Sequence, residues 1–335
     1  MSETSKTNLA IEARGLVKRF GQEVLAVDGV DLAIEANTIF ALLGPNGAGK
    51  TTTINMLTTL LEPTEGTAKV GGFDVVKQAN DVRNCIGVTF QETTLDNELT
   101  GVQTLNYHAR LYGMSKDQRQ AKIAELLALV ELEDAATRAI STYSGGMKRR
   151  LELIRGLMTD PKVLFLDEPT LGLDPQSRAR IGDYIVELKE DRGMSVLLTT
   201  HYMDEAEQLA DKVAIIDHGK ILIEGTPSEL VDQMGADVIT IAGQGNKEDF
   251  IEKVNDLSCC ETITTGNGII QIGVDSGSRR LVEIISLANK TDFTVEDISV
   301  AKPSLGDVFL KYTGRQFRDQ DQYTTVILQL FRRRL

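Results

Sequence analysis

Short apolar runs bounded by glycine, proline or charged residues recur along most of the chain. Four of them are continuous and contain β-branched residues, which is the pattern of strands buried on both faces of a parallel sheet: residues 38–43, 85–90, 163–166 and 196–200. Residues 9–20 and 24–35 read as longer strands, and residues 67–76 as a strand pair. The second long strand places Val30, Leu32 and Ile34 at every other position, as a strand with one buried face does. The pattern predicts an α/β fold.

Helical spacing of apolar residues appears in two places within this series of strands. Residues 97–139 are rich in charge and carry apolar residues at helical intervals, and a further periodic helix runs through Leu151, Ile154 and Leu157. We interpret residues 97–160, approximately, as a helical subdomain inserted into the α/β core. Residues 176–188 predict another helix.

The last third of the chain has a different order of elements. Its pattern predicts a strand, a helix, two strands, a helix and a strand, which is the split βαβ or ferredoxin-like arrangement: strands at 238–241, 261–264, 269–274 and 293–299, helices at 247–254 and 278–288. We therefore expect a first domain at residues 1–235, a small α+β domain at 236–315 and a tail at 316–335. The tail is apolar and basic, and it predicts a frayed end or a docking segment for a partner, with contact to an anionic membrane surface as the alternative.

A glycine-rich loop separates the first buried strand from a helix. It fits the pattern G-x-x-x-x-G-K-[ST], in which backbone N–H groups and a helix N-terminus surround phosphate oxygens. Lys50 can reach the β and γ phosphates, and the Thr51 hydroxyl can bind Mg²⁺. A chance match in a glycine-rich turn is the alternative, and the strand–loop–helix context disfavours it. The predicted nucleotide-binding residues are Gly44, Pro45, Asn46, Gly47, Ala48, Gly49, Lys50, Thr51 and Thr52.

Four further side chains lie where other buried strands end, and ligands of open α/β sheets gather at that edge. Asp167 is placed to hold Mg²⁺, and Glu168 to polarise the water that attacks the γ-phosphate; a helix cap is the alternative for this carboxylate pair. His201 can contact the γ-phosphate or that water. Gln91 ends the run at 85–90, and its meaning depends on its surroundings.

Two weaker signals complete the candidate site. Ser144, Gly145 and Gly146 precede a helix, so Ser144 can cap it and the glycines leave room for a second set of phosphate oxygens, although Ser-Gly-Gly is also a common turn. Phe20 can stack on an adenine ring, or it can be an ordinary core residue.

The composition narrows the class of partner. Asp and Glu outnumber Lys and Arg by 49 to 36, which gives a net charge of −13 and disfavours nucleic acid as a partner. The three cysteines have no metal-binding spacing, as expected of ordinary thiols in a reducing compartment. The polar N-terminus has no apolar signal core, and no apolar run approaches the ~20 residues of a membrane-spanning helix. We expect a cytoplasmic protein whose membrane role, if any, comes through a partner.

Taken in order, these motifs resemble the nucleotide-binding subunits of ATP-binding-cassette (ABC) transporters. The resemblance covers about residues 9–230. It implies that Phe20 is the adenine-stacking aromatic, Gln91 a residue that senses Mg²⁺ or water, Ser144–Gly146 the signature, Glu168 the catalytic glutamate and His201 the switch histidine. It also implies a P-loop ATPase core with an antiparallel β subdomain. Tyr143 and Met147 depart from the usual Leu-Ser-Gly-Gly-Gln signature and resemble the drug-exporter branch of daunorubicin-resistance ATPases.

The same resemblance implies partners. The signature of one cassette covers the ATP that another cassette holds, so the chain is expected to pair with a second copy or a homologous cassette. It is also expected to lie on the cytoplasmic face of the membrane and to power transport, with export as the direction that this branch implies, through a separate permease that docks near residues 91–98. A non-transport ABC ATPase acting on a soluble partner is the alternative function.

Overall fold

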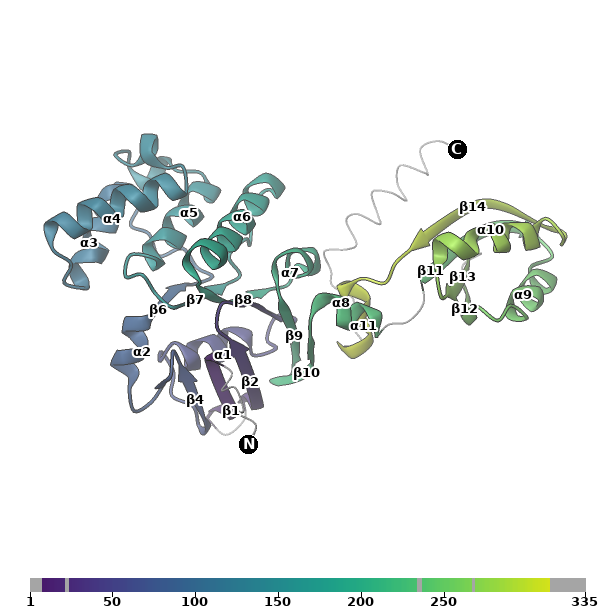
Figure 1. The fold of residues 1–335 in the computed structure, drawn as a ribbon, viewed down its shortest axis with the longest axis horizontal. Helices are drawn as coiled ribbons and strands as arrows, with labels where there is room; N and C mark the ends of the chain where they lie inside the picture. The colour runs from purple at the N-terminus through teal and green to yellow at the C-terminus, as the bar shows by residue number, and fades with distance from the viewer. Residues whose placement is uncertain (1–7, 22–23, 234–236, 267–268, 314–335) are drawn as a thin grey trace, which may run out of the picture. The chain divides into compact units, whose positions relative to one another are not determined.

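The structure of the chain, a computed structural model, describes residues 8–21, 24–233, 237–266 and 269–313 (Figure 1). The chain divides into two compact units, residues 1–227 and 228–335. The boundary predicted between 235 and 236 stays a prediction, and the predicted tail at 316–335 lies outside the described residues.

A six-stranded sheet forms the centre of the first unit. Its order is β10-β9-β3-β8-β7-β6, in which β10 is antiparallel to β9 and the others run parallel: β3 (Ile39–Leu43), β6 (Ile86–Thr89), β7 (Val163–Asp167), β8 (Ser195–Thr200), β9 (Lys212–Asp217) and β10 (Lys220–Gly225). Every residue of β3, β7 and β8 is buried, as their apolar sequences require. The run predicted at 85–90 is shorter than expected, because Cys85 ends a helix, α2 (Ala79–Cys85).

A second, antiparallel sheet has the order β2-β1-β4-β5: β1 (Leu9–Phe20), β2 (Val24–Glu35), β4 (Glu65–Val70) and β5 (Phe73–Asp74). One apolar cluster joins it to the central sheet, with α1 (Lys50–Leu57) contributing Ile54 and Leu57. This shared core fixes the position of the loop that leads into α1.

Three helices of the first unit pack on one another (Figure 1): α3 (Gly101–Leu111), α4 (Lys116–Leu129) and α5 (Gly145–Gly156), with short 3-10 helices at Glu133–Ala135 and Ile140–Thr142. That residues 97–160 form a separate subdomain stays a prediction. Capping boxes start α3 at Thr100 and α4 at Ser115. Two more helices, α6 (Pro175–Arg192) and α7 (Met203–Leu209), follow strands β7 and β8.

The boundary between the units falls after the first residue of α8 (Pro227–Asp232), and the second unit contains a four-stranded antiparallel sheet. Its order is β12-β13-β11-β14, and its elements follow one another as β11 (Asp237–Gly245), α9 (Lys247–Asn255), β12 (Cys260–Gly266), β13 (Ile269–Val274), α10 (Gly277–Ala288), β14 (Phe293–Ala301) and α11 (Leu305–Thr313). Its core includes Phe250 stacked on Phe293, with ring centroids 4.8 Å apart. None of the helices within the described ranges is both long and apolar enough to cross a membrane.

Candidate functional site: a nucleotide-binding loop and two carboxylates

The glycine-rich loop lies between β3 and α1, with Asn46 and Gly47 exposed at its tip. Lys50, the first residue of α1, is buried and turns back over the loop. Its Nζ donates to the carbonyl of Gly44 at 2.6 Å and to that of Pro45 at 3.3 Å. The ammonium group therefore lies against the backbone of the loop, and the N–H groups that it now gives to these two carbonyls could instead be given to phosphate oxygens.

Two glycines of this loop have no room for a side chain. A Cβ on Gly44 would lie 2.4 Å from the carbonyl oxygen of Ile216, and one on Gly49 would lie 2.5 Å from that of Ala26. Gly49 also has a φ of 107°, which side chains rarely adopt. The loop thus packs against the β2 strand and the end of β9, so its shape is fixed by the surrounding backbone.

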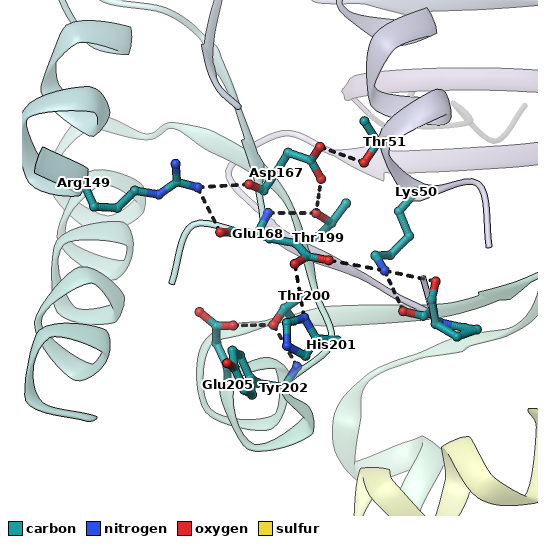
Figure 2. Close-up of polar contacts among 12 residues, drawn as sticks. Lys50, Thr51, Arg149, Asp167, Glu168, Thr199, Thr200, His201, Tyr202 and Glu205 are labelled. Carbon is teal, nitrogen blue, oxygen red and sulfur yellow. Dashed lines mark hydrogen bonds and ion pairs between the residues drawn. The ribbon is translucent and has the colours of Figure 1, made fainter. Parts of the chain in front are cut away.

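Asp167 ends β7 directly beside the loop and is 1% exposed. Its Oδ2 accepts a hydrogen bond from the Thr51 hydroxyl at 2.8 Å, and its Oδ1 accepts one from the Thr199 hydroxyl at 2.5 Å (Figure 2). A carboxylate and a hydroxyl are oxygen donors of the kind that Mg²⁺ prefers. The pair fits a magnesium ion that takes its other ligands from phosphate and water.

Glu168 follows with φ at 48°, in the left-handed region that costs a non-glycine residue about 1–3 kcal/mol. This turn directs its carboxylate to Lys50, 3.5 Å away, and to the Nδ1 atom of His201, 3.2 Å away. Burial raises the pKa of Glu168, but the hydrogen bond from His201 and the charge of Lys50 outweigh it and leave the pKa below its usual range. Burial conversely lowers the pKa of Lys50, and Glu168 offsets part of that change.

His201 follows β8, where a small polar network holds the loop. The Thr200 hydroxyl donates to the buried carboxylate of Glu205 on α7 and accepts from the backbone N–H of Tyr202 (Figure 2). Tyr202 in turn packs between the His201 ring and the guanidinium of Arg178, which lies 3.7 Å from the Tyr202 ring centroid. Burial raises the pKa of Glu205.

The Ser-Gly-Gly motif starts α5 as the sequence predicts. The Ser144 side chain accepts from the backbone N–H of Met147 at 3.3 Å and so caps the helix. Tyr143, the unusual first residue of the motif, is buried and donates its hydroxyl to the carbonyl of Ala135 at 2.8 Å, which ties the motif to the helical subdomain. In the described part of the chain, no hydrogen bond or ion pair joins Ser144–Gly146 to residues 44–52.

The two remaining predicted residues are exposed. Phe20 ends β1 and is 44% exposed, with the Lys18 ammonium 5.4 Å from its ring centroid. Gln91 lies two residues beyond β6, the strand that pairs with β7 and thus with the strand of Asp167. Both positions are open to a ligand, and their roles stay predictions.

The sequence reading missed Thr199, Thr200, Glu205 and Arg149. Thr199 had a usable signal, since in parallel strands of one sheet polar residues at the same carboxyl edge meet, and the structure pairs Asp167 with Thr199 in register. Arg149 had none, because every contact it makes in this region except one is to a backbone carbonyl.

Taken together, the strand–loop–helix with its buried lysine and the two carboxylates at the neighbouring strand end define a P-loop nucleotide-binding ATPase. Comparisons with known proteins specify the family. A family model described as ABC transporter matches residues 27–171. A daunorubicin/doxorubicin resistance ATP-binding protein of Streptomyces peucetius is 42% identical, over 93% of this chain and 94% of that protein. A Nod factor export ATP-binding protein of Burkholderia lata is 43% identical, over 92% of this chain and 98% of that protein.

The solved structures agree. A dimeric ATP-binding cassette in a post-hydrolysis state, bound to ADP and Pi, is 26% identical with a TM-score of 0.58, and the match covers 64% of this chain and 98% of that one. The chain belongs to the ABC transporter family of ATP-binding proteins and is an ATPase. This confirms the resemblance found in the sequence, including its drug-exporter branch.

Proposed function

We propose that this chain is the ATP-hydrolysing subunit of an exporter, that it closes as a dimer around two Mg-ATP molecules, and that it drives a separate membrane permease. The observation that carries the proposal is the convergence of Lys50, Thr51, Asp167 and Glu168 at one sheet edge. Relatives that match more than nine tenths of the chain are described as drug-resistance and Nod factor export ATP-binding proteins, which supports export. The non-transport alternative is not favoured by these relatives.

The geometry supports a division of roles within one cassette. Residues 44–52 would bind the phosphates through backbone N–H groups and Lys50, while Phe20 would stack on the adenine. Thr51 and Asp167, assisted by Gln91, would hold Mg²⁺, whose chemistry is to neutralise the charge on the phosphates. Glu168, kept ionised by His201 and Lys50, would accept a proton from the attacking water.

A second cassette completes the site in this proposal. Ser144, Gly145 and Gly146 start a helix whose N–H groups suit phosphate oxygens, yet they make no polar contact with the loop of their own chain among the described residues. They are therefore free to cover the ATP held by another copy or by a homologous cassette. The dimeric cassette that this chain resembles at 26% identity supports that arrangement.

Two finer statements belong to the same proposal. The permease contact would place the chain at the cytoplasmic face of the membrane, and residues 91–98 would form its docking surface. Residues 237–301 would form a ferredoxin-like accessory domain, which the βαββαβ order and the β12-β13-β11-β14 sheet support.

The experiment that tests the proposal combines two substitutions in the full chain. Glu168→Gln should keep ATP binding, abolish turnover and trap a closed dimer that co-purifies with a polytopic membrane protein in Mg-ATP. Lys50→Ala should lose ATP binding. Turnover at the wild-type rate by Glu168→Gln, or unchanged ATP affinity of Lys50→Ala, would refute the assignment of the site; a soluble ATP-bound dimer without a membrane partner would refute the transport role.

A further inference from the structure

Arg149 is a buried arginine on α5, the helix that the signature starts, and it has no role in the proposed function. It is the fifth residue of α5 and is 6% exposed. A guanidinium has five N–H donors, and here all five have acceptors: four backbone carbonyls and one carboxylate. A buried charge with complete hydrogen bonding of this kind fixes the position of whatever it holds.

Three of the carbonyls belong to consecutive residues around the catalytic carboxylate. The Nη2 atom donates to the carbonyls of Asp167 at 3.0 Å and Glu168 at 2.9 Å, and Nε donates to that of Pro169 at 2.6 Å (Figure 2 shows the first two). Glu168 has a left-handed backbone conformation, which persists only where its surroundings hold it. Its carbonyl accepts from the backbone N–H of Leu171 at 3.2 Å and from Arg149, so Arg149 is the side chain that adds to the hold on this turn.

The remaining donors lead to the segment that contains Gln91. Nη1 donates to the carbonyl of Phe90 at 2.6 Å and to Oε2 of Glu152 at 3.2 Å. The other oxygen of Glu152 accepts from the backbone N–H of Thr94 at 2.9 Å, and Glu152 is 1% exposed. The Arg149–Glu152 pair thus holds the chain on both sides of Gln91.

We propose that Arg149, supported by Glu152, is a positioning residue for ATP hydrolysis. Its side chain holds the backbone of Glu168, and it makes the position of that backbone depend on the positions of the Gln91 segment and of the signature helix. The inference rests on the proposed function, in which Glu168 is the catalytic base. All five donors of Arg149 go to acceptors within the protein, so it acts through the carbonyls of the Glu168 turn. Since Ser144 caps the helix that carries Arg149, a movement of the signature would reach Glu168 through the Arg149 side chain.

Shape, not charge alone, is what the site requires. Lysine carries the same charge but presents it as a point with three donors, so it cannot serve four carbonyls spread around a planar fork. Arg149→Lys should therefore behave almost like Arg149→Met. A role in overall packing or charge balance makes the opposite prediction, that lysine restores activity.

The test measures steady-state ATPase kinetics and binding of a non-hydrolysable ATP analogue by the full chain. We expect kcat to fall about 10–100-fold in Arg149→Lys and Arg149→Met, with KM and analogue affinity within about threefold of wild type. Arg150→Met is the matched control: the neighbouring arginine is half-buried and donates to the carbonyl of Val130 instead. If Arg149→Met does not fold, Glu152→Gln tests the same coupling, with an expected fall in kcat of about tenfold.

A spectroscopic readout follows the Gln91 segment directly. The chain contains no tryptophan, so Phe90→Trp supplies a single probe at the residue whose carbonyl Arg149 holds. The analogue should shift its emission in the otherwise wild-type and Arg150→Met backgrounds, and Arg149→Lys should abolish the shift. Absence of any shift in the wild-type background, or the same shift in the Arg149→Lys background, contradicts the coupling.

The outcomes separate this inference from the proposed function. Failure of the unmodified chain to bind or hydrolyse ATP would refute the proposed function. The Arg149 inference fails when the unmodified chain hydrolyses ATP and Arg149→Lys has the same kcat, or when the substitution raises KM and weakens analogue binding while kcat stays unchanged.

Discussion

Thr199 connects the carboxylate of Asp167 to the backbone of Glu168, and replacing it by valine removes that connection with little change in the shape of the side chain. The Thr199 hydroxyl donates to Asp167 at 2.5 Å and accepts from the backbone N–H of Glu168 at 3.0 Å, and the residue is fully buried. Loss of the bond to the charged carboxylate costs about 1.5–3 kcal/mol. Loss of the second bond adds about 0.5–1 kcal/mol. This cost is at the low end because the backbone N–H of Glu168 still donates to the backbone carbonyl of Thr199. Thr199→Val should therefore destabilise the first unit by about 2–4 kcal/mol.

Thermal unfolding followed by circular dichroism measures this cost. In a unit of this size, about 2–4 kcal/mol corresponds to a fall of roughly 4–16 °C in Tm. The relevant transition is the one that a bound ATP analogue raises, since a ligand stabilises the unit that binds it. Thr199→Ser is the control: it keeps the hydroxyl, loses one buried methyl group and should cost only about 1 kcal/mol.

The same substitution should raise the Mg²⁺ concentration needed for ATPase activity. A group that orients a metal ligand typically contributes about 10–100-fold in metal affinity, so half-maximal activity of Thr199→Val at saturating ATP should need at least about tenfold more Mg²⁺. Thr199→Ser should stay near wild type. If valine and serine cost the same stability and need the same Mg²⁺, the hydroxyl does not position Asp167 and the reasoning is refuted.

Three further substitutions test other parts of the site. Gly145→Ala should leave the Tm within about 2 °C of wild type, because its Cβ would meet only Leu173 at an ordinary 3.7 Å, yet it should lose most ATPase activity if the signature covers a second cassette's ATP; full activity contradicts that arrangement. Gly49→Ala should unfold at a much lower temperature than Gly47→Ala, since only Gly49 faces a backbone oxygen at 2.5 Å while both have positive φ, and equal Tm values would show that the loop relaxes. Glu168 has a lowered pKa in the folded chain, so its ionised form stabilises the fold above pH ~4.3, and this contribution is lost as the pH falls through the folded pKa. The stability of wild type relative to Glu168→Gln should therefore decrease between pH 7 and pH 3.5 in urea unfolding, and a constant difference would contradict the ionised assignment.

The sequence predicts the central sheet well because a strand buried on both faces leaves a clear apolar run. Residues 163–166 and 196–200 are such runs, and both are strands of the sheet. Helix α2 was missed for a physical reason: it is short and polar, and only Val82 and Cys85 are buried, so it has no apolar period to recognise. Helix α11 does bury Leu305, Val308 and Phe309 at helical spacing, and that signal was present but was not used.

In the candidate site, too, the residues that a local sequence pattern marks could be predicted, and the tertiary contacts between them could not. The phosphate loop and the Asp167-Glu168 pair are local patterns whose chemistry depends on their own side chains, and the structure brings Lys50, Thr51, Asp167 and Glu168 together. Several contacts that hold them in place are tertiary. Thr199 reaches Asp167 across a strand pair, and Asp167 also accepts from Thr51 on a helix far away in the sequence. Backbone carbonyls are the same at every residue, so no residue type in the sequence marks the ones that Arg149 uses.

Helix α5 shows what this division means for mechanism. At its first residue, Gly145 has only Leu173 near the position of a Cβ, so that end of the helix has room for a group from outside the chain. Four residues later, Arg149 has every donor bonded and no room to move independently of the Glu168 turn. A force applied to the first position must therefore reach Glu168 through the second, because a rigid helix joins them. If the proposed function holds, an ATP molecule that contacts the signature of one cassette would in this way influence Glu168 of that same cassette, which holds a different ATP, and the two sites of a dimer would respond to each other without any direct contact between them.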